Sequence, residues 1–177
     1  MRRPVVALSL VLMAALVPLA PSLAVRAQGE APKALEGSGG GLNLTAVRAI
    51  LAKGDAAAAS GNLAEARKQY DLARDISRRL LTSYRDISGA FRGLDARIPR
   101  EMDQNALESL ETLAQANLRL AAVFRRQNQP EVAVPLLVEV VKIMTPSREE
   151  GRKAYQSLIE IGFATIPYNG GVAVPGS

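Results

Sequence analysis

The longest periodic segment of this chain is residues 61–87, which read GNLAEARKQYDLARDISRRLLTSYRDI. Apolar side chains recur along it at alternating intervals of three and four residues, which is the repeat of one face of an α-helix. Ser77 takes one polar place on this stripe. The segment therefore predicts a long helix with one buried face, made of Leu63, Ala66, Tyr70, Ala73, Leu80, Tyr84 and Ile87.

The opposite face of this segment is charged. Aspartate and arginine recur on it three or four residues apart, and each such pair stabilises a helix by about 0.2–0.5 kcal/mol. We expect Asp71 to pair with Arg74, and Asp75 to pair with Arg78 and Arg79.

Further helices are expected on both sides of this segment. Residues 42–60 form a shorter amphipathic pattern, and Gly61 and Asn62 provide the turn that follows it. On the other side, residues 88–93 (SGAFRG) break the periodic pattern. The next helix is expected to begin near residues 98–99, because proline suits a first helical turn.

That helix should continue to Gln127, since its apolar residues keep the spacing of three and four. Glu101 and Asp103 lie near its expected start. Acidic side chains are favourable at the positive N-terminal end of a helix, so we expect both to interact with it.

The rest of the chain predicts two more helices, over residues 132–144 and 148–163. Pro135 should kink the first of them or mark a displaced start. Residues 132–144 are strongly apolar, which is typical of a deeply buried helix; a membrane-contacting face is the alternative. Residues 132–141 could also be read as a strand, but no other segment offers a strand to pair with it, so the expected fold class is all-α.

The N-terminal residues have the layout of a secretory signal. Arg2 and Arg3 precede an apolar run over residues 5–16, and small-residue sites follow that allow cleavage after Ala24 or Ala27. The run is short for a membrane span, although an uncleaved anchor is the alternative. We therefore expect an exported protein that contacts a membrane only through this signal, before cleavage.

Composition divides the remaining chain into three parts. Residues 28–41 are rich in glycine and predict a flexible linker, residues 42–165 form the helical domain, and residues 166–177 predict a flexible tail. The whole chain has 22 basic and 17 acidic residues. The three arginines of residues 1–27 leave with the signal, so the net charge of the mature chain is only +2. A charge this small does not indicate a nucleic-acid partner.

The inventory of reactive side chains is small. The chain has no cysteine and no histidine, which excludes thiolate nucleophiles, imidazole bases and the usual zinc ligands. Acid–base catalysis by carboxylates would fall to Glu101 and Asp103, or to Glu108 and Glu111, and it would need one carboxyl in an apolar pocket. Helix-dipole roles suit the first pair better, so we expect no enzyme, cofactor or metal site.

Two helix-turn-helix units can be superposed in the sequence with an offset of 67 residues, close to two repeats of about 34. The first unit holds Gly54, Ala57, Gly61, Asn62, Leu63, Ala66, Tyr70 and Ala73; the second holds Ala121, Phe124, Asn128, Gln129, Pro130, Ala133, Leu137 and Val140. This spacing resembles the tetratricopeptide repeat, in which small residues let two helices approach and an aromatic ring fills the space beside them.

The match to this family is incomplete. Arg78 stands where the repeat closes with proline, and Ile50 stands where it has tryptophan, so a plain helical bundle remains the alternative. Residues 69–73, 89–100 and 125–142 also resemble exported tetratricopeptide-like proteins of cyanobacteria. That resemblance implies a periplasmic or thylakoid-lumen location and carries no activity with it.

Basic residues gather before and within the expected loop. Residues 67–100 hold nine basic and four acidic side chains, and Phe91, Arg92, Arg97 and Arg100 lie in or beside the loop. Arginine binds carboxylates through two parallel hydrogen bonds, so we expect these residues to contact a protein or peptide partner.

Alternatives remain for each candidate contact. Phe91 could fill a gap between helices together with Leu94 and Ile98, while the arginines pair with Asp86, Asp95 and Glu101. Arg125 and Arg126 end a helix that would face a tetratricopeptide groove, and they could bind the partner or only stabilise the C-terminus of that helix.

These observations favour an exported, non-enzymatic adaptor that binds a protein or peptide partner. The alternative is a structural subunit, in which the same apolar stripes pack against sister copies in an oligomer or a larger complex.

Overall fold

The computed structural model describes residues 41–170. The signal and its two cleavage sites, the linker up to residue 40 and the tail from residue 171 therefore lie outside the described residues.

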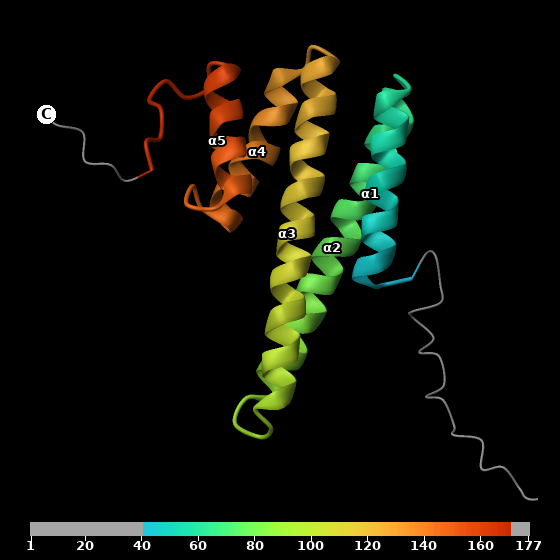
Figure 1. Cartoon of the computed structure of the whole chain (residues 1–177), viewed down its shortest axis with the longest axis vertical. Coiled ribbons are helices and arrows are strands. Elements are labelled where there is room, and N and C mark those ends of the chain that lie inside the picture. Colours follow the sequence, from blue (N-terminus) through green and yellow to red (C-terminus); the bar gives the residue numbers. More distant parts are fainter. Residues whose placement is uncertain (1–40, 171–177) are drawn as a thin grey trace, which may run out of the picture. The chain divides into compact units, whose positions relative to one another are not determined.

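Residues 41–170 form five α-helices and no strand, which confirms the all-α class for this part of the chain. Successive helices run in opposite directions and are joined by short connections (Figure 1). The helices are α1 (Leu44–Ala59), α2 (Leu63–Phe91), α3 (Arg97–Arg126), α4 (Pro130–Met144) and α5 (Glu149–Glu160).

Each helix packs against its neighbour in sequence, and α3 lies at the centre of the arrangement. α2 and α4 both pack on α3, whereas their backbones do not approach each other closely. The loop between α2 and α3 lies beyond the ends of α1, α4 and α5 (Figure 1). None of the five helices of residues 41–170 is both long enough and apolar enough to cross a membrane.

The turn between α1 and α2 forms where the sequence predicts it. Gly61 has a positive φ of 82°, a conformation that glycine adopts without steric cost. The side chain of Asn62 then accepts a hydrogen bond from the amide of Glu65 at 3.1 Å. This bond satisfies one of the free amides at the start of α2.

The core contains most of the two superposed units. Tyr70 is 2% exposed, Ala66 and Ala73 are fully buried, and so are Ala133 and Val140. The ring of Tyr70 lies against Gly54, and its hydroxyl donates a hydrogen bond to Asp55 Oδ1 at 2.7 Å. The packing of α1 against α2 thus uses the small and aromatic residues that the repeat pattern singles out.

The break expected at residues 88–93 begins later, because α2 continues to Phe91 and the chain leaves the helix at Arg92 and Gly93. Ser88 is buried against α3, and its hydroxyl donates a hydrogen bond to Asp103 at 2.7 Å. This contact holds the last turn of α2 to α3 despite the glycine at position 89. Ile87, expected on the buried stripe, is 41% exposed instead.

The start of α3 also differs from the expectation. Its first turn contains no acidic residue, so Glu101 and Asp103 do not stand at its N-terminal end. The carboxylate at that end belongs to Asp95, which accepts a hydrogen bond from the amide of Arg97 at 2.9 Å. Asp103 bonds to Ser88 instead, as described above.

α4 begins two residues earlier than expected, with Pro130 as its first residue. Proline lacks the amide hydrogen that would be unsatisfied in a first turn anyway. Pro135 lies inside the helix and neither ends it nor marks its start.

The charge pairs expected along α2 are wrong. Asp71 pairs with Arg67 at 3.7 Å, and Arg74 and Arg78 both reach across to Glu139 on α4. The two arginines thus pair with a helix that packs, like α2, on α3.

Candidate binding cleft between α2, α3 and α4

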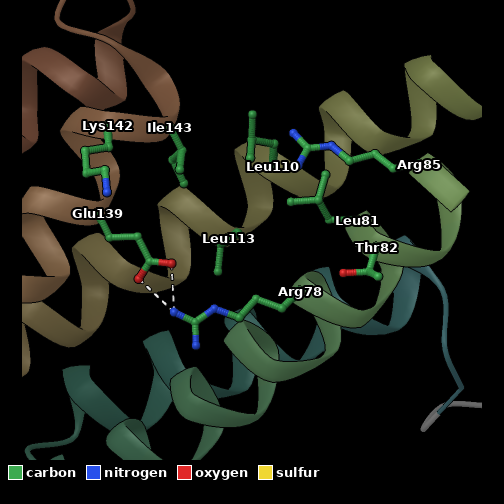
Figure 2. A pocket seen from close by; sticks show the side chains of 9 residues that line it. All are labelled: Arg78, Leu81, Thr82, Arg85, Leu110, Leu113, Glu139, Lys142 and Ile143. Carbon is green, nitrogen blue, oxygen red and sulfur yellow. Dashed lines mark hydrogen bonds and ion pairs between the residues drawn. The ribbon is translucent and has the colours of Figure 1, made fainter.

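A cleft of about 540 Å³ lies where α2 and α4 stand apart on the surface of α3. Two helices form its walls and the third forms its floor (Figure 2). It is lined by Arg78, Leu81, Thr82 and Arg85 of α2, Leu110 and Leu113 of α3, and Glu139, Lys142 and Ile143 of α4.

The floor of the cleft is apolar. Leu113 is 3% exposed and Leu81 is 9% exposed, and both belong to a small cluster separate from the main core. Leu110 and Ile143 pack against this cluster and are only partly buried. A ligand could therefore bury an apolar side chain against this floor, which removes apolar surface from water.

Glu139 joins the two walls at one end of the cleft. Arg78 Nη2 lies 2.7 Å and 2.8 Å from the two carboxylate oxygens of Glu139, and Arg74 Nη2 lies 3.3 Å from one of them. Figure 2 shows the contacts with Arg78 spanning the gap. Burial would raise the pKa of Glu139, but the hydrogen bonds and charges of Arg78 and Arg74 outweigh it and hold that pKa below its usual value.

Two further cations line the cleft. Arg85 stands on the α2 wall and Lys142 on the α4 wall (Figure 2), and both side chains are exposed. Neither forms an ion pair with any residue in the described range. With Arg78 and Glu139 neutralising each other, the cleft keeps two positive charges beside an apolar floor.

The α2–α3 loop and its flanks hold four of the residues that the sequence singles out. Phe91 is 38% exposed and Leu94 is 79% exposed, so these two do not fill a gap between helices, and that alternative is wrong for them. Arg97 forms two hydrogen bonds with Asp95, at 3.1 Å and 2.7 Å. Arg92 and Arg100 are exposed.

Arg125 and Arg126 have structural partners at the other end of α3. Arg125 Nη2 lies 2.9 Å from the carboxylate of Glu160 on α5. Arg126 donates a hydrogen bond at 3.0 Å to the carbonyl of Ala58, in the last turn of α1. The two arginines therefore connect α3 with α5 and α1, at the end of α3 opposite the α2–α3 loop.

The carboxylates considered for catalysis are mostly paired. Glu108 pairs with Arg48 at 2.9 Å, and Glu111 pairs with Arg148 at 3.1 Å. Asp103 accepts the bond from Ser88. These contacts give each of the three a role in holding the helices together.

Sequence reasoning missed the cleft. It placed Arg78 in a pair along its own helix, and it did not single out Leu81. Two signals were present: Leu81 extends the apolar stripe of α2 sideways, and Glu139 and Lys142 interrupt an otherwise apolar helix. Neither signal reveals that the two helices face each other across α3.

Comparisons with protein-family models, with curated proteins and with solved structures found no match.

Proposed function

We propose that this chain is an exported, non-enzymatic adaptor of the periplasm or thylakoid lumen, and that its α2–α3–α4 cleft binds a segment of a partner protein. A tetratricopeptide-like arrangement of helical hairpins is part of this proposal. It is supported by the offset of 67 residues between the two units and by the packing of Tyr70 against Gly54.

The cleft is the observation that carries this proposal. It combines a leucine-lined floor with a charged rim. Apolar side chains that anchor a peptide, with polar groups around them that fix its orientation, are the usual features of peptide grooves.

The walls of the cleft are also held in place before any ligand binds. Glu139 accepts hydrogen bonds from Arg74 and Arg78 across the gap, and both walls pack on α3. A preformed groove loses little conformational freedom on binding, which favours affinity.

The α2–α3 loop offers a second contact in this proposal. Phe91, Arg92 and Arg100 are exposed there, in a loop held by two long helices. Binding residues are often found on loops that a rigid scaffold positions.

A cleft-filling variant tests the proposal in the native compartment. Thr82 is exposed and lines the cleft, whereas its neighbour Ser83 is exposed and does not. The chain would be crosslinked in place as wild type, Thr82→Trp and Ser83→Trp. We expect Thr82→Trp to reduce the crosslinked partner while Ser83→Trp preserves it, with both variants melting like the wild type. Equal crosslinking by the two variants, or no partner above background for the wild type, would refute the proposal.

A structural subunit is the alternative function, and one surface favours it. Phe163, Ile166 and Tyr168 follow α5 and are 61%, 75% and 43% exposed. Light scattering after size exclusion would show an oligomer that persists on dilution if these residues pack against a sister copy. In that case Phe163→Ser with Ile166→Ser should release the monomer.

A further inference from the structure

We infer that the cleft selects a partner segment in which an apolar side chain is flanked by acidic ones. This inference rests on the proposed function and adds the chemistry of the ligand. The distribution of charged and apolar side chains in the cleft supports it.

Two positive charges in the cleft are available to a ligand, those of Arg85 and Lys142. Arg78 is committed to Glu139 through two short hydrogen bonds, and Arg74 adds a third. A ligand carboxylate at Arg78 would have to displace Glu139 from the cleft wall. Arg85 and Lys142 need no such displacement, because neither pairs with another residue of the described chain.

These two charges lie on different walls of the cleft. Arg85 projects from α2 and Lys142 from α4, with Leu110 and Leu113 of α3 on the floor between the walls (Figure 2). A segment that lays one apolar side chain on this floor would bring its neighbouring residues to the two walls. Acidic neighbours would meet a guanidinium on one side and an ammonium on the other.

An apolar contact on the floor would strengthen the charged contacts at the walls. An apolar side chain seated on the floor excludes water from the cleft, and charges attract more strongly where the local dielectric constant is lower. Arginine can also bind a carboxylate through two parallel hydrogen bonds. A basic segment would instead place like charges together, which discriminates against it.

Synthetic peptides test this inference directly. The probe is fluorescein-labelled Gly-Glu-Glu-Leu-Glu-Glu-Gly, capped at both ends and titrated with the mature chain by fluorescence anisotropy. Three comparison peptides replace the glutamates with glutamine, the glutamates with lysine, or the leucine with serine. We expect the probe to bind more tightly than all three, and its binding to weaken as salt is raised.

Protein variants then locate the site. Arg85→Gln and Lys142→Gln should each weaken probe binding by about tenfold, the change that 1.4 kcal/mol produces. Arg79→Gln is the matched control, since Arg79 is exposed on α2 but does not line this cleft. It should bind the probe as the wild type does.

The outcomes separate this inference from the proposed function. If any of the three comparison peptides binds as well as the probe, or if Arg85→Gln and Lys142→Gln bind it normally, the inference is wrong. The proposed function would still hold in that case if Thr82→Trp crosslinks less of the native partner than the wild type does. A partner that crosslinks equally to Thr82→Trp and wild type would overturn both.

Discussion

The ring of Tyr70 on α2 lies directly against the backbone of Gly54 on α1, with no space for a side chain between them. A Cβ atom at position 54 would lie 2.7 Å from Tyr70 Cδ1 and 3.1 Å from Tyr70 Cζ. The contact is rigid on both sides, because Tyr70 is 2% exposed and Gly54 is buried within a helix. The approach of α1 to α2 therefore depends on glycine at this position.

Gly54→Ala should destabilise the protein, because the added methyl group collides with a ring that cannot move away. Overpacking of this kind costs roughly 1–3 kcal/mol, measurable as a lower free energy of unfolding in urea. Gly89→Ala is the control: it lies in α2 with no atom within 4 Å of the added Cβ. That change should leave stability unchanged or raise it by up to about 1 kcal/mol. Similar effects of the two substitutions would contradict the packing described here.

Substitutions of Tyr70 should separate the ring from its hydroxyl. Tyr70→Ala leaves a cavity between α1 and α2 and should cost about 3–5 kcal/mol. Tyr70→Phe removes only the hydrogen bond to Asp55, which keeps its contact with Arg119 at 2.8 Å, and should cost about 1 kcal/mol. The check is urea unfolding of both variants; a thermal midpoint that stays unchanged in Tyr70→Ala would show that the ring is not buried.

The bridge at Glu139 predicts a loss of stability in acid. The pKa of Glu139 is lowered from its ordinary 4.5, so the folded protein favours the charged carboxylate more than the unfolded chain does. This contribution is fully present above pH 4.5 and disappears as the pH falls through the folded pKa.

Glu139→Gln should therefore reduce stability at neutral pH and flatten its decline between neutral and acidic pH. Urea unfolding across that range measures both effects. Glu101→Gln serves as the control, because Glu101 is exposed, lies beyond the first turn of α3 and forms no ion pair with the described residues. A decline as steep in Glu139→Gln as in the wild type would show that the bridge does not contribute.

Asn117→Leu should stabilise the protein. Asn117 is fully buried in α3, and neither its amide nitrogen nor its oxygen has a hydrogen-bond partner among the described residues. A buried polar group without a partner costs about 1–3 kcal/mol, and leucine has a similar branched shape without that cost. The matched control is Ser109→Ala, since the buried hydroxyl of Ser109 does have a partner, the carbonyl of Asn105 at 2.8 Å. A lower melting temperature for Asn117→Leu would instead indicate that a bound water satisfies the amide.

The double change Arg92→Ala with Arg97→Ala should leave the melting temperature almost unaltered. Both side chains are exposed, and the contact between Arg97 and Asp95 is a surface pair, which the surrounding water screens, so its loss should change stability very little. If the α2–α3 loop contacts the partner, this variant should crosslink less partner than the wild type does. Crosslinking of the wild type should also decrease as the salt concentration is raised. A lower melting temperature with normal partner recovery would show that the loop serves only the fold.

The periodic pattern was sufficient to predict the buried stripe of α2 as far as Leu80, because the spacing of three and four is a local property of a helix. The same holds for the turn at Gly61 and Asn62, where glycine and asparagine have their own backbone preferences. The contact of α1 with α2 could also be predicted from the sequence, since a short turn forces consecutive helices to pack against each other.

Prediction was wrong where a distant residue supplied the partner. The glycine at position 89 indicated a break, yet the bond from Ser88 to Asp103 on α3 keeps α2 helical up to Phe91. Arg78 had an acidic neighbour at the right spacing on its own helix, yet it reaches Glu139 on α4.

The sequence alone thus determined the all-α class, the segments that form most of the helices and the packing of Tyr70 on α1, because each depends on periodicity or on two consecutive helices joined by a short turn. The tertiary structure decided the cleft. Leu81, Leu110 and Ile143 are far apart in the chain, and they come together only because α2 and α4 both pack on α3 while the backbones of α2 and α4 stay apart. The separation of two helices by a third is a property of three-dimensional packing, which no local spacing encodes.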